Sequence, residues 1–87
     1  MRDSLGMSLP VIEHQPEQHR FVCQLDHQTA VLSYQLLNGS VNFTHTFTPP
    51  EFRGRGVSTA LVQAGLSWAR DQKLEIHASC WFVQKFL

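Results

Sequence analysis

The sequence predicts an α+β fold in which an antiparallel sheet packs against one long helix and a short C-terminal helix, in the order β-β-β-α-β-α. Three observations predict this fold. The chain has 87 residues, enough for one domain with a small core. Apolar and polar residues alternate along three segments of its first half, as they do in half-buried strands. Apolar residues then recur every three or four positions over about 57–71, which is typical of an amphipathic helix. We therefore expect a single domain over residues 1–87.

The three alternating segments are the expected strands, 20–25, 29–37 and 40–48. Residues 11–14 could form a further short strand before them. Asn38 and Gly39 separate the last two strands and are the strongest short-range signal for a hairpin, because both central residues of a type I′ turn need a positive φ. Pro49 and Pro50 end the third strand, since neither has an N–H group for the sheet.

A two-residue turn also fixes the register of this hairpin. The predicted pairs are Leu36–Val41, Tyr34–Phe43, Leu32–His45 and Ala30–Phe47. All eight side chains then lie on one face of the sheet, which we expect to be the core face. His45 is the one histidine predicted on that face.

The helix from Val57 to about Asp71 has a wide apolar arc, which indicates contact with more than one neighbour. The sheet is one neighbour, and either the C-terminal segment or another subunit is the second, so we expect a monomer or a weak homodimer. Residues 73–79 are expected to form a strand and 80–87 a short closing helix. The aromatic residues of this helix are expected in the core: Trp81, Phe82 and Phe86.

The composition argues against several classes of protein. Seven basic and seven acidic residues cancel, so the chain lacks the positive field that draws proteins to nucleic acid, and we expect no nucleic-acid partner. Cys23 and Cys80 lack CxxC spacing, which favours reduced thiols over a metal site or a disulfide scaffold. No window is apolar enough for a signal peptide or a membrane span. We expect a soluble, cytoplasmic protein with no metal and no membrane partner.

The loop that precedes the long helix reads Arg53-Gly54-Arg55-Gly56. Unpaired N–H groups at a helix N-terminus attract phosphate, and glycines let a phosphate approach the backbone. The two arginines could add charge-assisted contacts, and Ser58 and Thr59 could donate hydroxyl groups. The alternative is a tight turn with solvated arginines. The loop is neither a P-loop nor a dinucleotide fingerprint.

These motifs, taken in order, resemble the GNAT superfamily of acetyl-CoA-dependent N-acetyltransferases. The family's acyl-CoA loop reads Q/R-x-x-G-x-G/A, and residues 53–58 match at Arg53 and Gly56 but depart at Ser58. A narrower resemblance, to small single-domain GNAT-like proteins, covers roughly residues 11–87. The segments that carry it are His45-Thr46, the run from Pro50 to Gly56, "STALVQAGLSWAR", and Cys80-Trp81-Phe82-Val83.

The resemblance implies that the strands on either side of the long helix splay apart and that the pantetheine arm of coenzyme A lies between them. Backbone groups around Phe47 and Thr48 would pair with it, and the prolines give a local reason for the splay. The residues implied to hold the rest of the cofactor are Arg53, Gly54, Arg55, Gly56, Val57, Ser58 and Thr59.

The resemblance also implies two catalytic residues. Cys80 is expected to accept the acetyl group or to protonate coenzyme A, and the alternative is a buried small apolar residue. His45 is expected to take the proton of the amine, and the alternative is a core histidine. Cys23 is expected in the core, and Glu51 could be a base or a helix-terminal charge. The remaining histidines are expected on the surface or in turns: His14, His19, His27 and His77.

The expected function is therefore transfer of an acetyl group from acetyl-CoA to an amine, such as a protein lysine or N-terminus. A catalytically silent acyl-CoA-binding module is the alternative. A third hypothesis, an RNA-binding module that uses Arg53 and Arg55, is disfavoured by the neutral charge.

Overall fold

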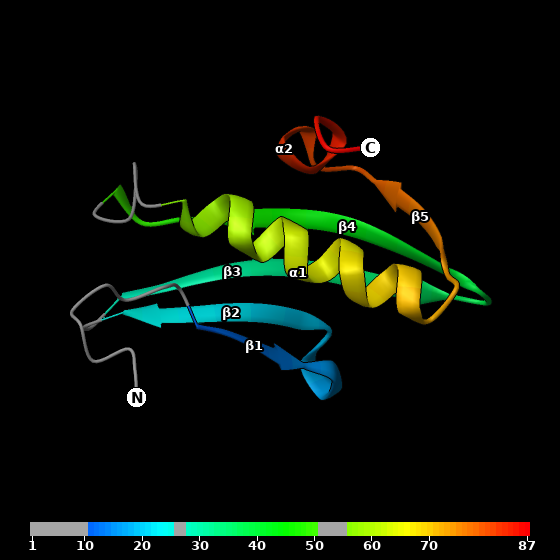
Figure 1. Cartoon of the computed structure of the whole chain (residues 1–87), viewed down its shortest axis with the longest axis horizontal. Helices are drawn as coiled ribbons and strands as arrows, with labels where there is room; N and C mark the ends of the chain where they lie inside the picture. The colour runs from blue at the N-terminus through cyan, green and yellow to red at the C-terminus, as the bar shows by residue number, and fades with distance from the viewer. Residues whose placement is uncertain (1–10, 26–27, 51–55) are drawn as a thin grey trace.

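The computed structural model describes residues 11–25, 28–50 and 56–87. Within them the chain forms one sheet in the order β1-β2-β3-β4-β5, with two α-helices and a 3-10 turn. The strands are β1 (Ile12–Gln15), β2 (Arg20–Leu25), β3 (Gln28–Leu37), β4 (Ser40–Phe47) and β5 (Glu75–Ala78). The helices are α1 (Val57–Asp71) and α2 (Trp81–Gln84), and the 3-10 turn η2 (Pro16–Gln18) joins β1 to β2. Figure 1 shows α1 lying across one face of the sheet, and β5 leading away from β4 toward α2.

The predicted α+β fold with one long and one short helix is confirmed, with two differences in the sheet. Residues 12–15 do form a strand, which pairs with β2. The sheet is mixed, because β5 runs parallel to β4 while the other pairs are antiparallel. The parallel pair follows from the connection, since a helix that crosses the sheet brings the next strand back in the same direction.

The hairpin between β3 and β4 turns at the predicted residues but in a different conformation. Leu37 pairs with Ser40, so Asn38 and Gly39 form the two-residue loop. Gly39 has a φ of 78°, whereas the non-glycine residues with positive φ in the described chain are His19 and Lys73. Asn38 is therefore not in the left-handed region that a type I′ turn requires.

The predicted register of this hairpin is right near the turn and wrong beyond it. Leu36 faces Val41 and Tyr34 faces Phe43, as expected. The register then shifts between Ser33 and Tyr34, which face His45 and Phe43, so Thr44 is an extra residue on β4. Such a β-bulge places two residues of one strand against one of its partner and bends the strand.

Because of the bulge, the side chains in the second half of β4 lie on the faces opposite to those predicted. Leu32 faces Thr46 instead of His45, and Val31 takes the place of Ala30 opposite Phe47. His45 and Phe47 are exposed, and Phe47 keeps 50% of its accessible surface. Neither lies on the core face. We call the face covered by α1 the inner face and the opposite face the outer face.

The core lies between the inner face and α1. Its fully buried members come from three strands and both helices, and they include Cys23, Leu32, Val41, Phe43, Val57, Leu61, Val62 and Val83. At the point of closest approach α1 has Gly65, where an added Cβ would lie 2.9 Å from both Leu32 and Phe43.

The C-terminal helix α2 supplies the second neighbour that the wide apolar arc of α1 predicted. Val83 is buried in the same cluster as the apolar residues of α1, and Phe82 and Phe86 pack against that cluster. Their rings are 5.4 Å apart. Trp81 is the exception to the expected aromatic core, because it is 82% exposed.

An aromatic cluster that the sequence did not predict surrounds His14 of β1. The His14 ring stacks on Phe21 at a centroid distance of 4.1 Å and meets Trp68 edge-on at 4.9 Å. Its Nε2 lies 2.6 Å from the Tyr34 hydroxyl. His14 is therefore part of the packed structure and not the surface or turn residue that was expected.

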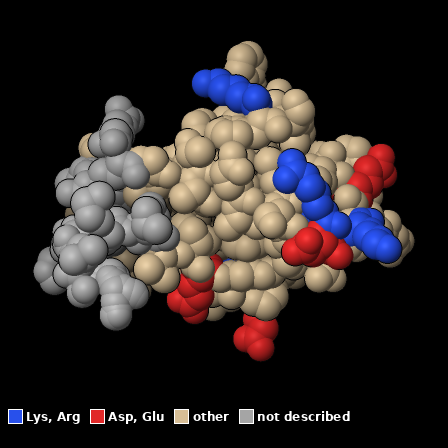
Figure 2. All heavy atoms as spheres, in the orientation of Figure 1, with Lys and Arg blue, Asp and Glu red and all other residues tan. Residues whose placement is uncertain are grey.

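No helix in the described ranges has the length and apolar character needed to cross a membrane. In Figure 2, basic and acidic side chains are interspersed on the viewed face, so neither sign gathers into a patch there among the residues that the structure describes.

Candidate functional site

The pairing between β4 and β5 stops after four residue pairs, from Ser40–Glu75 to Phe43–Ala78. We call the region beyond the last pair, between Thr46 of β4 and Cys80, the cleft. The Phe43 carbonyl closes the ladder by accepting hydrogen bonds from the backbone N–H groups of Ser79 at 3.0 Å and Cys80 at 3.2 Å. The bulge at Thr44 follows at once and bends β4. The pairing of β4 with β5 thus ends at the bulge, before the chain reaches the prolines to which the predicted splay was attributed.

Cys80 lies two residues beyond Ala78, the last residue of β5 that pairs with β4. Cys80 has an extended backbone at the N-cap position of α2 and is half-buried. Its Sγ lies 3.3 Å from the hydroxyl oxygen of Thr46, across the cleft on β4. The Cys80 thiol and the Thr46 hydroxyl are therefore within hydrogen-bonding distance of each other just beyond the last residue pair.

The surroundings of Cys80 favour its thiolate form. Burial raises the pKa of the thiol, but hydrogen bonds from the side chain and backbone of Thr46 and from two backbone groups of α2 lower it more. The net pKa lies below the ordinary value of 9.0. A thiol with a lowered pKa is more often ionised at neutral pH and so reacts more readily with electrophiles.

Cys23 is the contrasting thiol. It is fully buried in the core, as expected, and burial raises its pKa. The described residues contain no disulfide, and both cysteines are free thiols. They also contain no group of three or more His, Cys, Asp or Glu side chains that could hold a metal ion.

The start of α1 lies beside the end of β4. Gly56 is the N-cap residue, with a φ of 74°, and because it has no side chain it cannot cap the N–H groups of the first turn. The hydroxyl groups of Thr48 and Ser58 are hydrogen-bonded to each other and thereby join the two ends of the loop. Thr59 is exposed, whereas the Val57 side chain is buried in the core and leaves only its backbone for a ligand.

Several predicted site residues lie outside the described residues: Glu51, Arg53, Gly54 and Arg55. Phe47 and His45 belong to the part of β4 beyond the bulge, with their side chains on the outer face. The structure thus brings Cys80 to the opening of the cleft and places the Thr48–Ser58 contact at the start of α1.

Sequence reasoning missed Thr46 as a site residue. Strict alternation from Phe43 puts His45 on the inner face and Thr46 on the outer one, and the bulge reverses both positions. The motif His45-Thr46 was visible in the sequence, but nothing in it indicated which of the two faces Cys80.

Comparison with known proteins identifies the family of the chain. A family model described as GCN5-related N-acetyl-transferase matches residues 20–87. The chain belongs to this family. The predicted resemblance to N-acetyltransferases of this kind is therefore confirmed.

Members of the family that resemble the chain come from vertebrates and bacteria. The chain is 33% identical to Protein NATD1 of Homo sapiens over 97% of its own length and 78% of that protein. It is likewise 33% identical to Protein NATD1 of Xenopus tropicalis, over 98% and 82%. The NMR solution structure of a GCN5-like protein from Staphylococcus aureus matches with a TM-score of 0.70 and 30% identity, covering 92% of this chain and 79% of that one.

Proposed function

We propose that this chain transfers an acetyl group from acetyl-CoA to a primary amine, with Cys80 as the nucleophile. The observation that carries the proposal is the position of the Cys80 thiol, at the divergence of β4 and β5 and 3.3 Å from the Thr46 hydroxyl. Membership of the GCN5-related N-acetyltransferase family supports acetyl-CoA as the donor.

The cleft offers the groups that an acyl-CoA needs. Beyond Phe43 the edge of β4 has no β5 partner among the described residues, so its backbone groups around Phe47 and Thr48 are available to pair with the pantetheine amides. The N–H groups at the start of α1 suit the diphosphate, and Arg53 and Arg55 are proposed to add positive charge there.

Cys80 supplies the first chemical step. Its thiolate attacks the carbonyl carbon of the thioester, the bond to the sulfur of coenzyme A breaks, and coenzyme A leaves as a thiolate that takes a proton from solvent. The acetyl group is then joined to Sγ of Cys80. The lowered pKa of Cys80 supports this role, because it increases the share of the thiolate, which is the form that attacks.

The second step passes the acetyl group to the amine. The amine nitrogen attacks the acetyl carbon, the bond to Sγ breaks, and Cys80 returns as a thiolate while the nitrogen loses a proton. We propose His45 as the group that takes this proton. His45 is exposed on the outer face, whereas Thr46 on the inner face is the residue beside Cys80, so we propose that the proton reaches His45 through water.

Two further parts of the proposal follow from the chemistry. A thiol nucleophile must stay reduced, which supports a cytoplasmic location. The acceptor is proposed to be a neutral primary amine, such as a lysine or a protein N-terminus, because only the unprotonated nitrogen has a lone pair for attack.

Intact-mass spectrometry of the protein after incubation with acetyl-CoA tests the first step. We expect a gain of one acetyl group in the wild type and in Cys23→Ala, and none in Cys80→Ser. Cys23→Ala is the matched control because it removes the other thiol of the chain. An equal gain in Cys80→Ser would refute the role of Cys80.

Cofactor binding is measured separately by the thermal shift on adding coenzyme A, since a ligand that binds the native state raises its stability. A folded protein that shows no shift at saturating coenzyme A would refute the enzyme hypothesis. A shift without transfer to any member of an amine panel would favour the acyl-CoA-binding module instead.

Single-turnover kinetics test the second step. After the acetyl-enzyme has formed, we expect His45→Ala to slow its reaction with amine by on the order of 100-fold, a typical contribution of a general base. Formation of the acetyl-enzyme should be unchanged. If both steps are unchanged, His45 is not the base.

A further inference from the structure

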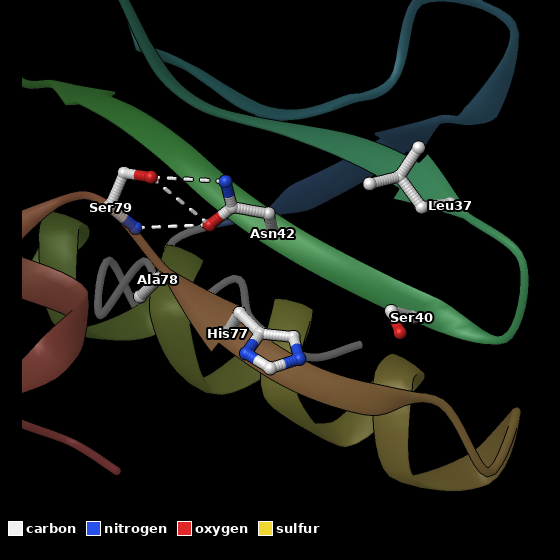
Figure 3. Close-up of a pocket in the computed structure, with 6 residues that line it drawn as sticks. All are labelled: Leu37, Ser40, Asn42, His77, Ala78 and Ser79. Carbon is white, nitrogen blue, oxygen red and sulfur yellow. Dashed lines mark hydrogen bonds between the residues drawn. The ribbon is translucent and has the colours of Figure 1, made fainter.

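The carboxamide of Asn42 forms a clamp with Ser79 on the outer face of the sheet. Asn42 Nδ2 donates to Ser79 Oγ at 3.0 Å, and Asn42 Oδ1 accepts from the Ser79 backbone N–H at 3.0 Å. The Ser79 hydroxyl also lies 3.4 Å from Oδ1. Figure 3 shows the two side chains pointing toward one another across the strands.

The clamp lies at the side of a shallow pocket of about 380 Å³. The pocket is lined by Leu37, Ser40, Asn42, His77, Ala78 and Ser79. In the ladder Asn42 faces His77, so its side chain reaches diagonally along β5 to the residue two positions further on. That residue is the first one after β5 ends and the last one before Cys80.

This position sets where β5 leaves β4. The Ser79 N–H is shared between the Phe43 carbonyl and the Asn42 carboxamide, while the next N–H, that of Cys80, also reaches the Phe43 carbonyl. Without the clamp, only the single Phe43 carbonyl would hold both N–H groups. The direction in which the chain departs, and with it the placement of the Cys80 thiol opposite Thr46, would be less strictly fixed.

We propose that Asn42 is a positioning residue for the Cys80 thiol, acting through its clamp on Ser79. The role rests on the acetyl transfer proposed above. Asn42 is not hydrogen-bonded to the sulfur; its carboxamide holds Ser79, the residue that precedes Cys80.

The ladder already supplies the general cohesion of the two strands. Four residue pairs join β4 to β5, and Gln84 of α2 donates from Nε2 to the Ala78 carbonyl at 2.8 Å. The clamp adds contacts one residue beyond these, next to the thiol. A role in placing Cys80 therefore predicts effects on the sulfur that exceed the effects on folding.

The test is the alkylation rate of Cys80 by iodoacetamide, followed by peptide mass spectrometry across a range of pH. This readout reports the reactivity and ionisation of the thiol. In Asn42→Ala we expect a rate on the order of ten times lower at neutral pH, as the loss of one or two hydrogen bonds would give, and a profile shifted to higher pH. Ser40→Ala, in the same pocket on the same face, is the matched control and should keep the wild-type profile.

A double-mutant cycle assigns the effect to the clamp. Ser79→Ala removes only the hydroxyl partner and should lower the rate less than Asn42→Ala does. The double variant should be no slower than Asn42→Ala alone. A folded Asn42→Ala protein with wild-type rate and profile would overturn the proposal. If Asn42→Ala does not fold, a folded Ser79→Ala protein with the wild-type rate would do so.

The alkylation assay needs no acetyl-CoA, so its result is separate from that of the proposed function. A wild type that is never acetylated would refute the transferase hypothesis, yet the clamp would still stand or fall on the alkylation profiles. If the wild type is acetylated, Asn42→Ala should form the acetyl-enzyme about ten times more slowly, with an unchanged dissociation constant for coenzyme A.

Discussion

The two halves of β4 belong to one strand but have different neighbours. In the first half, Ser40 to Phe43, each residue pairs with β3 on one side and β5 on the other, and Val41 and Phe43 are fully buried. In the second half, beyond the bulge at Thr44, pairing with β3 continues but β5 is gone. The first half contributes to the core, and the second half has no β5 partner and places the Thr46 hydroxyl beside the Cys80 thiol.

One extra residue, Thr44, therefore lies at the boundary between the half of β4 that pairs with two strands and the half that pairs with β3 alone. Edge strands are usually protected because their free backbone groups invite further pairing. In the described part of the chain, the edge of β4 beyond β5 lies next to a thiol with a lowered pKa. The predictions below alter one half of β4, or the elements attached to it, and ask whether stability or chemistry responds.

The largest effect is expected from truncating Phe43 in the first half. Phe43→Ala should lower the free energy of unfolding by about 3–5 kcal/mol, because a fully buried ring is removed beneath α1. The matched control is Phe47→Ala in the second half, where the ring is 50% exposed, and we expect a loss below about 1 kcal/mol. Urea unfolding of both variants measures the contrast. Equal losses would mean that the two halves do not differ as described.

Deleting Thr44 should lower the rate of acetyl transfer while leaving the protein folded. Tyr34–Phe43 and Ser33–His45 would become consecutive pairs, so His45, Thr46 and Phe47 would keep their faces while the bend of the bulge disappeared. We expect a folded protein whose acetyl transfer falls on the order of 100-fold, because donors along the β4 edge are no longer aimed at the substrate.

The control for this deletion is Thr44→Ala, which keeps the extra residue and should keep both the thermal shift with coenzyme A and the transfer rate. Circular dichroism establishes folding before activity is compared. A folded deletion variant with wild-type transfer would show that the bulge does not form the cleft.

This bulge also marks how far the sequence could predict the molecule. The alternating segments, the helix over 57–71 and the order of elements follow from periodicity, which is a local property of the chain. The position of Cys80 at the end of a strand followed from the same pattern. All of these depend on residues close to one another in sequence.

What the sequence could not predict depends on contacts between distant residues. Nothing in the sequence at Thr44 distinguishes a bulge from a regular strand position. The prediction therefore assigned His45 and Thr46 to the wrong faces of the sheet. The Asn42–Ser79 clamp joins residues 37 positions apart. The place of His14 against Trp68 likewise exists only once β1 and α1 pack on the same sheet.

A smaller effect is expected from two glycines that flank the β4 and α1 segment. Gly39 and Gly56 have φ values of 78° and 74°, and an added Cβ would meet nothing within 4 Å at either one. Changing either to alanine should cost about 1 kcal/mol of stability, from backbone strain alone. Only Gly56→Ala should also weaken coenzyme A binding, since only Gly56 precedes the first turn of α1. Calorimetric titration of both variants checks this, and equal binding by the two would remove Gly56 from the site.

The smallest effect concerns the packed region around His14, remote in the sheet order from the β4–β5 cleft. Burial lowers the pKa of His14 below its ordinary value of 6.5, so the folded state binds a proton less readily than the unfolded state. The contribution of neutral His14 to the free energy of unfolding should therefore be fully present above about pH 6.5 and be lost as the pH falls below it through the lowered pKa.

His14→Gln keeps a polar partner for the Tyr34 hydroxyl but cannot titrate, so its free energy of unfolding should fall less steeply between about pH 7.5 and 5. Because this cluster belongs to the packed part of the sheet, the pH dependence of Cys80 alkylation should be the same in His14→Gln as in the wild type. A change there would mean that the packed region and the cleft are coupled.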